Sequence, residues 1–131
     1  MEKRTLNVVC AIIIKNNRYF LARRPHDKHH GGFWEFPGGK VQASETTEFA
    51  IAREIKEELN IRVEATEVLE PVFQEQDELI LKLIPIKVRW VDGEVKLFEH
   101  SESSWYRLED ILSLNLCPGD AKIVKRFLQN Q

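Results

Sequence analysis

The first third of the chain alternates between apolar runs and short polar interruptions. Leu6–Ile14 is almost continuously apolar, which is typical of a strand buried on both faces. The polar triplet Lys15-Asn16-Asn17 then predicts a hairpin turn, and Arg18–Arg23 predicts the returning strand. Arg24–Gly32 follows as a polar loop. The pattern therefore predicts an antiparallel hairpin near the N-terminus.

The central segment changes from the two-residue period of a strand to the period of a helix. Thr46 is the expected N-cap, and Glu48 places a negative charge in the first turn, where the helix dipole favours it. The residues expected on the core side of this helix are Phe49, Ala52, Ile55 and Leu59. We expect the opposite flank to carry the carboxylates.

The second half again reads mainly as strands and ends with a helix. Val72–Phe73 and Leu79–Val91 predict strands, the longer one interrupted by Pro85 and followed by a turn at Asp92-Gly93. Three further elements are expected: a short strand over Ser103–Tyr106, a helical turn over Asp110–Leu112, and a C-terminal helix from Pro118 to about Gln129 that buries Ile123, Val124, Phe127 and Leu128.

These elements define a fold class. Strands with two principal helices on opposite sides predict an α+β protein, an α/β/α sandwich around a mixed β-sheet. We expect residues 1–131 to form a single domain, because the chain is long enough for one core and has no repeat or Pro/Gly/Ser-rich linker.

Composition narrows the class of protein further. Apolar residues make up 43% and charged residues 31% of the chain, and the formal net charge is −2. No basic patch is available for a nucleic acid polymer. The longest apolar run is too short for a membrane span or a signal peptide core, so we expect a cytoplasmic protein without membrane contact. Cys10 and Cys117 are expected to be buried free thiols.

Candidate chemistry is concentrated in residues 39–61. Glu54, Glu57 and Glu58 are spaced i, i+3 and i+4, so one helix face would bring three carboxylates together. Such a trio suits a hard divalent cation, although glutamate-rich faces are often merely solvated. Gly38-Gly39 precede the helix and predict a tight loop that approaches a phosphate or its metal closely.

Together these positions resemble the Nudix box. Gly39, Glu45, Arg53-Glu54-Ile55, Glu57-Glu58 and Ile61 match the fixed positions of that pattern over 23 residues. Asn60 stands where the family has glycine. Because asparagine tolerates a left-handed conformation, we expect this departure to cost a little stability but no activity. The Trp34–Lys40 and Leu116–Asp120 segments resemble MutT-type members.

The resemblance implies a Nudix fold and a set of residue roles. Gly39, Glu54, Glu57 and Glu58 match metal ligands for Mg²⁺ or Mn²⁺, and Arg53 matches the residue that orients Glu54. Four other positions have less specific support. Glu45 is expected to be an auxiliary ligand or base, or simply a favourable acid near the helix start. Lys40 is expected to neutralise phosphate charge. Glu99 is expected to be an added ligand or general base, and its neighbour His100 is interpreted as a bystander.

Nucleotide recognition is assigned to four residues outside the helix. Arg24 matches a nucleotide-contacting arginine of MutT relatives, and Phe36 and Trp34 offer flat walls for a base, with core packing as the alternative. Asp120 stands where the MutT type has asparagine, which leaves guanine, oxidised guanine and cytosine open.

The function implied by the resemblance is hydrolysis of a nucleoside triphosphate by water attack at the β-phosphorus, giving nucleoside monophosphate and pyrophosphate. An oxidised nucleotide such as 8-oxo-dGTP is the first candidate. The alternatives are a pyrophosphatase for (d)CTP or a modified pyrimidine triphosphate, a Nudix enzyme for another nucleoside diphosphate derivative, and a non-catalytic nucleotide sensor. The expected partner is a small nucleotide, bound by a monomer or homodimer.

Overall fold

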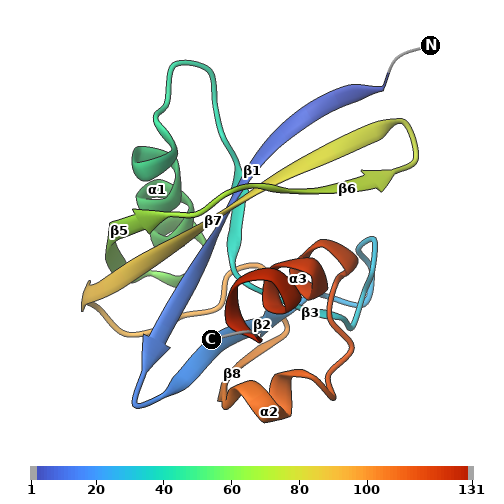
Figure 1. The fold of residues 1–131 in the computed structure, drawn as a ribbon. Coiled ribbons are helices and arrows are strands. Elements are labelled where there is room, and N and C mark those ends of the chain that lie inside the picture. Colours follow the sequence, from blue (N-terminus) through green and yellow to red (C-terminus); the bar gives the residue numbers. More distant parts are fainter. Residues whose placement is uncertain (1–2, 130–131) are drawn as a thin grey trace.

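The computed structural model describes residues 3–129 and contains a mixed sheet with few helices, which is the predicted α+β fold (Figure 1). In chain order its elements are β1 (Arg4–Lys15), β2 (Arg18–Arg23), β3 (Trp34–Glu35), β4 (Gly38–Lys40), α1 (Thr47–Leu59), β5 (Arg62–Val68), β6 (Val72–Gln76), β7 (Leu79–Asp92), β8 (Glu102–Tyr106), α2 (Leu108–Ile111), α3 (Pro118–Ile123) and the π-helix η1 (Val124–Leu128).

Strand β1 is central to the sheet. It pairs in parallel with β7 and antiparallel with β2 and β4, whereas β5 and β6 pair antiparallel with β7. The β1–β2 turn is the predicted one, with positive φ of 51° at Asn16 and 62° at Asn17, as its tight geometry requires. Strand β8 pairs with β2 and thereby brings the end of the chain back toward the N-terminal hairpin.

Strand β7 runs through Pro85 without a break. Its partner changes there, because β6 pairs up to Leu83 and β5 begins pairing at Ile86. Proline has no N–H to donate, so its position at this change of partner costs the sheet little. Strand β5 was absent from the sequence prediction, because only Val63 of its seven residues is buried.

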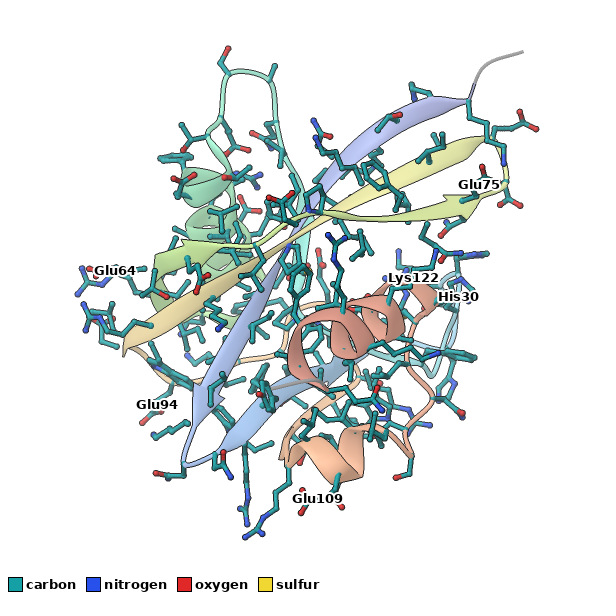
Figure 2. All side chains as sticks on the ribbon, viewed as in Figure 1. His30, Glu64, Glu75, Glu94, Glu109 and Lys122 are labelled. Carbon is teal, nitrogen blue, oxygen red and sulfur yellow. The ribbon has the colours of Figure 1, made fainter. Side chains whose placement is uncertain are left out.

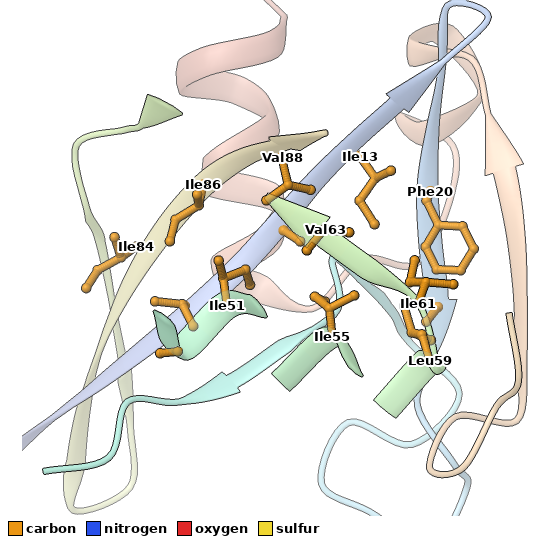
Figure 3. Packing of buried hydrophobic residues seen from close by; sticks show 14 residues of the cluster. Ile13, Phe20, Ile51, Ile55, Leu59, Ile61, Val63, Ile84, Ile86 and Val88 are labelled. Carbon is orange, nitrogen blue, oxygen red and sulfur yellow. The ribbon is translucent and has the colours of Figure 1, made fainter. Parts of the chain in front are cut away.

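Two apolar clusters lie on opposite faces of the sheet. Val9, Ala11 and Ile13 of β1 pack with α1 in the cluster of Figure 3, while Cys10 and Ile12 pack with α3 and η1 in the other. The near-continuous apolar run of β1 is explained by this arrangement, since alternate side chains enter different clusters. Cys10 and Cys117 are both buried free thiols, as predicted.

The helices differ from the prediction in two details. The C-terminal helix begins at Pro118 but continues as a π-helix from Val124, where the Gln129 N–H donates to the Val124 carbonyl at 2.8 Å. Phe127 is half-buried, whereas Ile123, Val124 and Leu128 are buried.

Acidic residues on the outside of the fold are mostly solvated or paired. Glu64, Glu75, Glu94 and Glu109 are exposed and project outward in Figure 2. Two of them form surface ion pairs, Glu64 with Arg89 at 2.7 Å and Glu75 with Lys3 at 3.2 Å. Such exposed pairs contribute little stability, which distinguishes these acids from the buried carboxylate described below.

Candidate active site

Helix α1 has the ends that its sequence predicts. Thr46 is the N-cap, and its hydroxyl accepts the Phe49 N–H at 3.1 Å. Asn60 caps the other end in the left-handed region, with φ 63°, and its N–H donates to the Lys56 carbonyl. The structural reason proposed for asparagine at the glycine position of the box is therefore confirmed.

The rotation of α1 about its axis corrects the predicted core face. Phe49 is 62% exposed and Ala52 is half-buried, whereas the buried residues are Ala50, Ile51, Ile55, Glu58 and Leu59. The helix is turned so that the flank carrying Glu54 and Glu58 enters the protein. The carboxylates thus lie at the edge of the buried face rather than opposite it, a position that only packing against the sheet decides.

Arg53 connects the start of the box to its helix. Its guanidinium donates to both Glu45 oxygens, at 2.6 and 2.9 Å, and to the Lys40 carbonyl at 3.1 Å. It also donates to Glu54 at 3.0 Å and to Glu57 at 3.2 Å. A rigid guanidinium fork suits this multiple contact. Arg53 therefore contacts the Glu54 carboxylate directly, which is the contact that the role implied by the resemblance requires.

Glu45 is fully engaged by structural partners. Besides its two bonds to Arg53, it accepts the Gln42 N–H at 2.7 Å, and these bonds lower the pKa of its carboxyl, the Arg53 hydrogen bond most of all. Only 8% of its side chain is exposed. This geometry favours a supporting role for Glu45 over that of a ligand or base.

Glu58 is a buried carboxylate without a complete set of partners. Its Oε2 atom has no hydrogen-bond partner in the described part of the chain, and only 7% of the residue is exposed. Burial, followed by the nearby Glu99 and Glu54 carboxyls, raises the pKa of Glu58 to about 10. Burial also raises the pKa of Glu54, to which Glu57 and Glu99 contribute. Glu54, Glu57, Glu58 and Glu99 therefore lie in one electrostatic neighbourhood.

Gly39 lies against this neighbourhood. An added Cβ there would collide with the Glu54 carboxylate, and one at Gly38 would collide with the Val9 carbonyl. Residues 38–40 form β4 against β1 instead of the predicted tight loop. Without side chains, the two glycines let β4 lie close to β1 and to the Glu54 carboxylate. Lys40 ends β4 with an exposed side chain.

A second polar group is centred on Glu35 of β3. Candidate ligand atoms of Glu35, Cys117 and Asp120 lie within 4.8 Å of one another. Within residues 3–129 this is the trio that meets that spacing. The carboxylates of Glu54 and Glu57 on α1 are instead hydrogen-bonded to Arg53. Burial, then Asp120 and Glu35, raises the pKa of Cys117, and burial raises that of Asp120.

The four residues predicted to recognise a nucleotide are gathered around this second group. Arg24 donates to Glu35 at 3.1 Å and to the His29 carbonyl at 2.7 Å. Asp120 accepts the Phe36 N–H at 2.9 Å and is 7% exposed. Trp34 and Phe36 are 7% and 2% exposed, which favours the core-packing alternative over a stacking wall for both.

Two residues of this region were missed or undervalued in the sequence. Glu35 was not singled out, although a carboxylate between two buried aromatic residues is a usable signal. His100 was interpreted as a bystander, yet it is 8% exposed and its Nε2 lies 2.9 Å from Glu35 Oε2. Its position beside Glu99 in the sequence gave no indication of this contact.

The chain is similar to several known proteins over nearly its whole length. Residues 3–127 match the NUDIX domain model. The chain is 32% identical over 123 residues to a CTP pyrophosphohydrolase of Escherichia coli K12, covering 94% of this chain and 91% of that protein. It is 29% identical over 114 residues to an 8-oxo-dGTP diphosphatase of the same organism, covering 86% and 88%. The crystal structure of a MutT protein from Methanosarcina mazei Go1 superimposes with a TM-score of 0.87 at 32% identity, covering 97% of this chain and 95% of that one.

With its box helix, its fold and these relatives, the chain belongs to the Nudix family. It is a MutT-type Nudix hydrolase. Hydrolases of this family generally use a divalent metal and act on small nucleotide substrates. Among the described residues, no helix is both long and apolar enough to span a membrane.

Proposed function

We propose that this protein hydrolyses nucleoside triphosphates to nucleoside monophosphate and pyrophosphate, with Mg²⁺ or Mn²⁺ bound at α1. The observation that carries this proposal is Glu58. Its buried Oε2 has no hydrogen-bond partner among residues 3–129, and it lies beside the Glu54 and Glu99 carboxyls. A divalent cation would supply the missing partner and offset the repulsion among the acids.

The metal would be held by Glu54, Glu57, Glu58 and Glu99, with the Gly39 carbonyl. A bound ion of this kind neutralises phosphate charge and lowers the pKa of a coordinated water. Arg53 keeps the carboxylates of Glu54 and Glu57 in place, and Glu45 keeps Arg53 in place. The exposed Lys40 ammonium, at the end of β4, is available to a phosphate group.

The substrate would extend from this cluster toward Glu35, Arg24 and Asp120. An oxidised nucleotide such as 8-oxo-dGTP is the first candidate, supported by MutT-type relatives named 8-oxo-dGTP diphosphatase. CTP is the second, supported by the CTP pyrophosphohydrolase relative and by aspartate at position 120. The raised pKa of Asp120 favours a neutral carboxyl, which both donates and accepts hydrogen bonds.

The test is a panel of purified nucleoside triphosphates, including 8-oxo-dGTP and CTP, with Mg²⁺ in H₂¹⁸O. Release of pyrophosphate that carries the label is expected, since water is proposed to attack the β-phosphorus. Label in the monophosphate would instead show attack at the α-phosphorus. Release of inorganic phosphate alone, or no turnover of any member of the panel, would contradict the proposal.

A variant pair ties the reaction to α1. Glu54→Gln keeps the volume but removes a ligand charge, so turnover should fall by several orders of magnitude, at least about a thousandfold, while the fold is retained. Glu48→Gln makes the same change at an exposed position of the same helix and should leave turnover near that of the wild type. Near-normal turnover of the Glu54 variant with Mg²⁺ would exclude the proposed metal site. The cytoplasmic location and the monomeric or homodimeric state remain predictions from the sequence.

A further inference from the structure

The loop between β7 and β8 is fastened on both sides of Glu99 and His100. The Phe98 N–H donates to the Glu58 carbonyl at 3.3 Å, at the end of α1. The Ser101 N–H donates to the Arg23 carbonyl at 3.0 Å, at the end of β2. Two residues therefore bridge the gap between the box helix and the β2–β8 pair.

The two side chains of the bridge have different environments. Glu99 is exposed and lies close enough to Glu58 and Glu54 to raise the pKa of both. His100 is buried, and its Nε2 lies 2.9 Å from Glu35 Oε2. Because the Glu35 carboxylate also accepts a hydrogen bond from Arg24, we assign it as the acceptor toward His100 and place the donated proton on the Nε2 atom of His100.

The second ring nitrogen of His100 indicates that this residue does more than fill space in the core. His100 Nδ1 is buried and has no hydrogen-bond partner within the described residues. Burying an unpaired polar atom is unfavourable, and an apolar side chain would fill the same space without that cost. What histidine provides here and an apolar residue does not is the Nε2–H···Glu35 bond.

We propose that His100 is a positioning residue: its hydrogen bond to Glu35 holds the 98–101 bridge so that Glu99 is presented to Glu54 and Glu58. This inference deepens the proposed function, on which it rests, because it concerns the geometry of the metal site. His100 touches neither substrate nor metal in this assignment. Through Glu35 it also connects the carboxylates of α1 with Arg24 and Asp120, at the nucleotide end of the site.

Two variants of nearly equal size separate the hydrogen bond from the volume of the ring. His100→Gln places an amide N–H near the position of Nε2 and keeps the bond to Glu35. His100→Met has a side chain of similar length without a donor, and its apolar character suits a buried site, so it is expected to fold. Glu94→Gln, an exposed change in the same loop, is the control (Figure 2).

The first readout is Mn²⁺ binding to the nucleotide-free protein, followed by electron paramagnetic resonance. Loss of a residue that orients a metal ligand typically weakens metal binding or activity about 10- to 100-fold. We therefore expect His100→Met to raise the Mn²⁺ Kd at least about tenfold, while His100→Gln and Glu94→Gln stay within about threefold of wild type. Equal Kd values for the two His100 variants, whether weakened or normal, would overturn the proposal.

The second readout is steady-state kinetics with the best triphosphate of the panel. His100→Met should lower kcat by a factor similar to its loss of Mn²⁺ affinity, with a smaller change in KM, and His100→Gln should recover most of kcat. A wild-type protein that binds Mn²⁺ but hydrolyses no triphosphate would refute the proposed function, while the Mn²⁺ comparison would still decide the role of His100. An effect on KM alone would overturn the positioning role.

Discussion

Glu58→Gln should stabilise the metal-free protein while impairing its metal site. The folded protein buries the Glu58 carboxyl and raises its pKa from 4.5 to about 10. Between these values the folded state binds more protons than the unfolded state, so this group lowers stability progressively as the pH rises from about 4.5 to about 10. Glutamine is neutral throughout and avoids this loss.

The size of the effect follows from the pKa difference. At pH 7.5 the pH lies about three units above the unfolded pKa, and at about 1.4 kcal/mol per unit this amounts to roughly 4 kcal/mol. Glu99 beside it is exposed, and an effective dielectric constant well above that of a dry protein interior applies even at buried sites, which reduces the penalty. We therefore expect a gain of about 2 kcal/mol, or a Tm increase of about 6–10 °C for a domain of this size.

Thermal unfolding in EDTA at pH 7.5 and pH 4.5 measures this gain. At pH 4.5 Glu58 is largely protonated in the folded state and partly so in the unfolded state, so most of the difference between variant and wild type should disappear. Glu57→Gln is the matched control, since Glu57 is an exposed neighbour on the same helix. Its stability should change by less than about 0.5 kcal/mol at either pH.

Added Mn²⁺ should reverse the order of the two proteins. Wild type gains stability because the ion binds the folded state, and the Glu58→Gln variant gains less because it has lost a ligand charge. The reasoning would be refuted if the Glu58→Gln variant were more stable than wild type by the same amount at both pH values, which would point to packing rather than ionisation. A Mn²⁺-induced Tm increase as large in the variant as in the wild type would also refute it.

Two further changes test the ends of the site. Asp120→Asn keeps an acceptor for the Phe36 N–H, so the fold should survive. The ratio of kcat/KM between 8-oxo-dGTP and dCTP should nevertheless change at least about tenfold. An unchanged ratio in competition assays would make Asp120 a purely structural acid. In Arg53→Lys, the lysine cannot reproduce the bidentate contact with Glu45 together with the bonds to Glu54 and Glu57. The kcat of this variant should therefore fall about 10- to 100-fold with little change in KM. A kcat equal to that of the wild type would contradict the positioning role of Arg53.

Local chemistry in the sequence was sufficient for the ends of elements and the order of the box. Thr46 as N-cap, Asn60 in a left-handed conformation and the Asn16-Asn17 turn depend on neighbours a few residues away, and all three are confirmed. The long apolar strand β1 was equally readable, because its segment buried on both faces, residues 9–13, is not interrupted by a polar residue. Strand β5 was not, because its single buried residue gives no clear alternation.

The rotation of α1 is the clearest case that the sequence did not decide. Phe49 and Ala52 fit a helical apolar stripe as well as Ala50 and Ile51 do, so periodicity alone allowed both faces. Packing against β1 and β5 selected the face that includes Glu58. A carboxylate was buried as a result, and its raised pKa follows from that burial.

The amino-acid sequence by itself determined the family, the box helix with its caps, and which carboxylates share that helix, because these depend on spacing within a few turns of one helix. Tertiary structure alone decided which of those carboxylates is buried, and that Arg53 reaches back to Glu45 and Lys40. It also brought His100 to Glu35 and Asp120 to Phe36, contacts between residues 65 and 84 positions apart. Spacing along the chain carries no information about such pairs, since the packing of the strands and loops sets their separation.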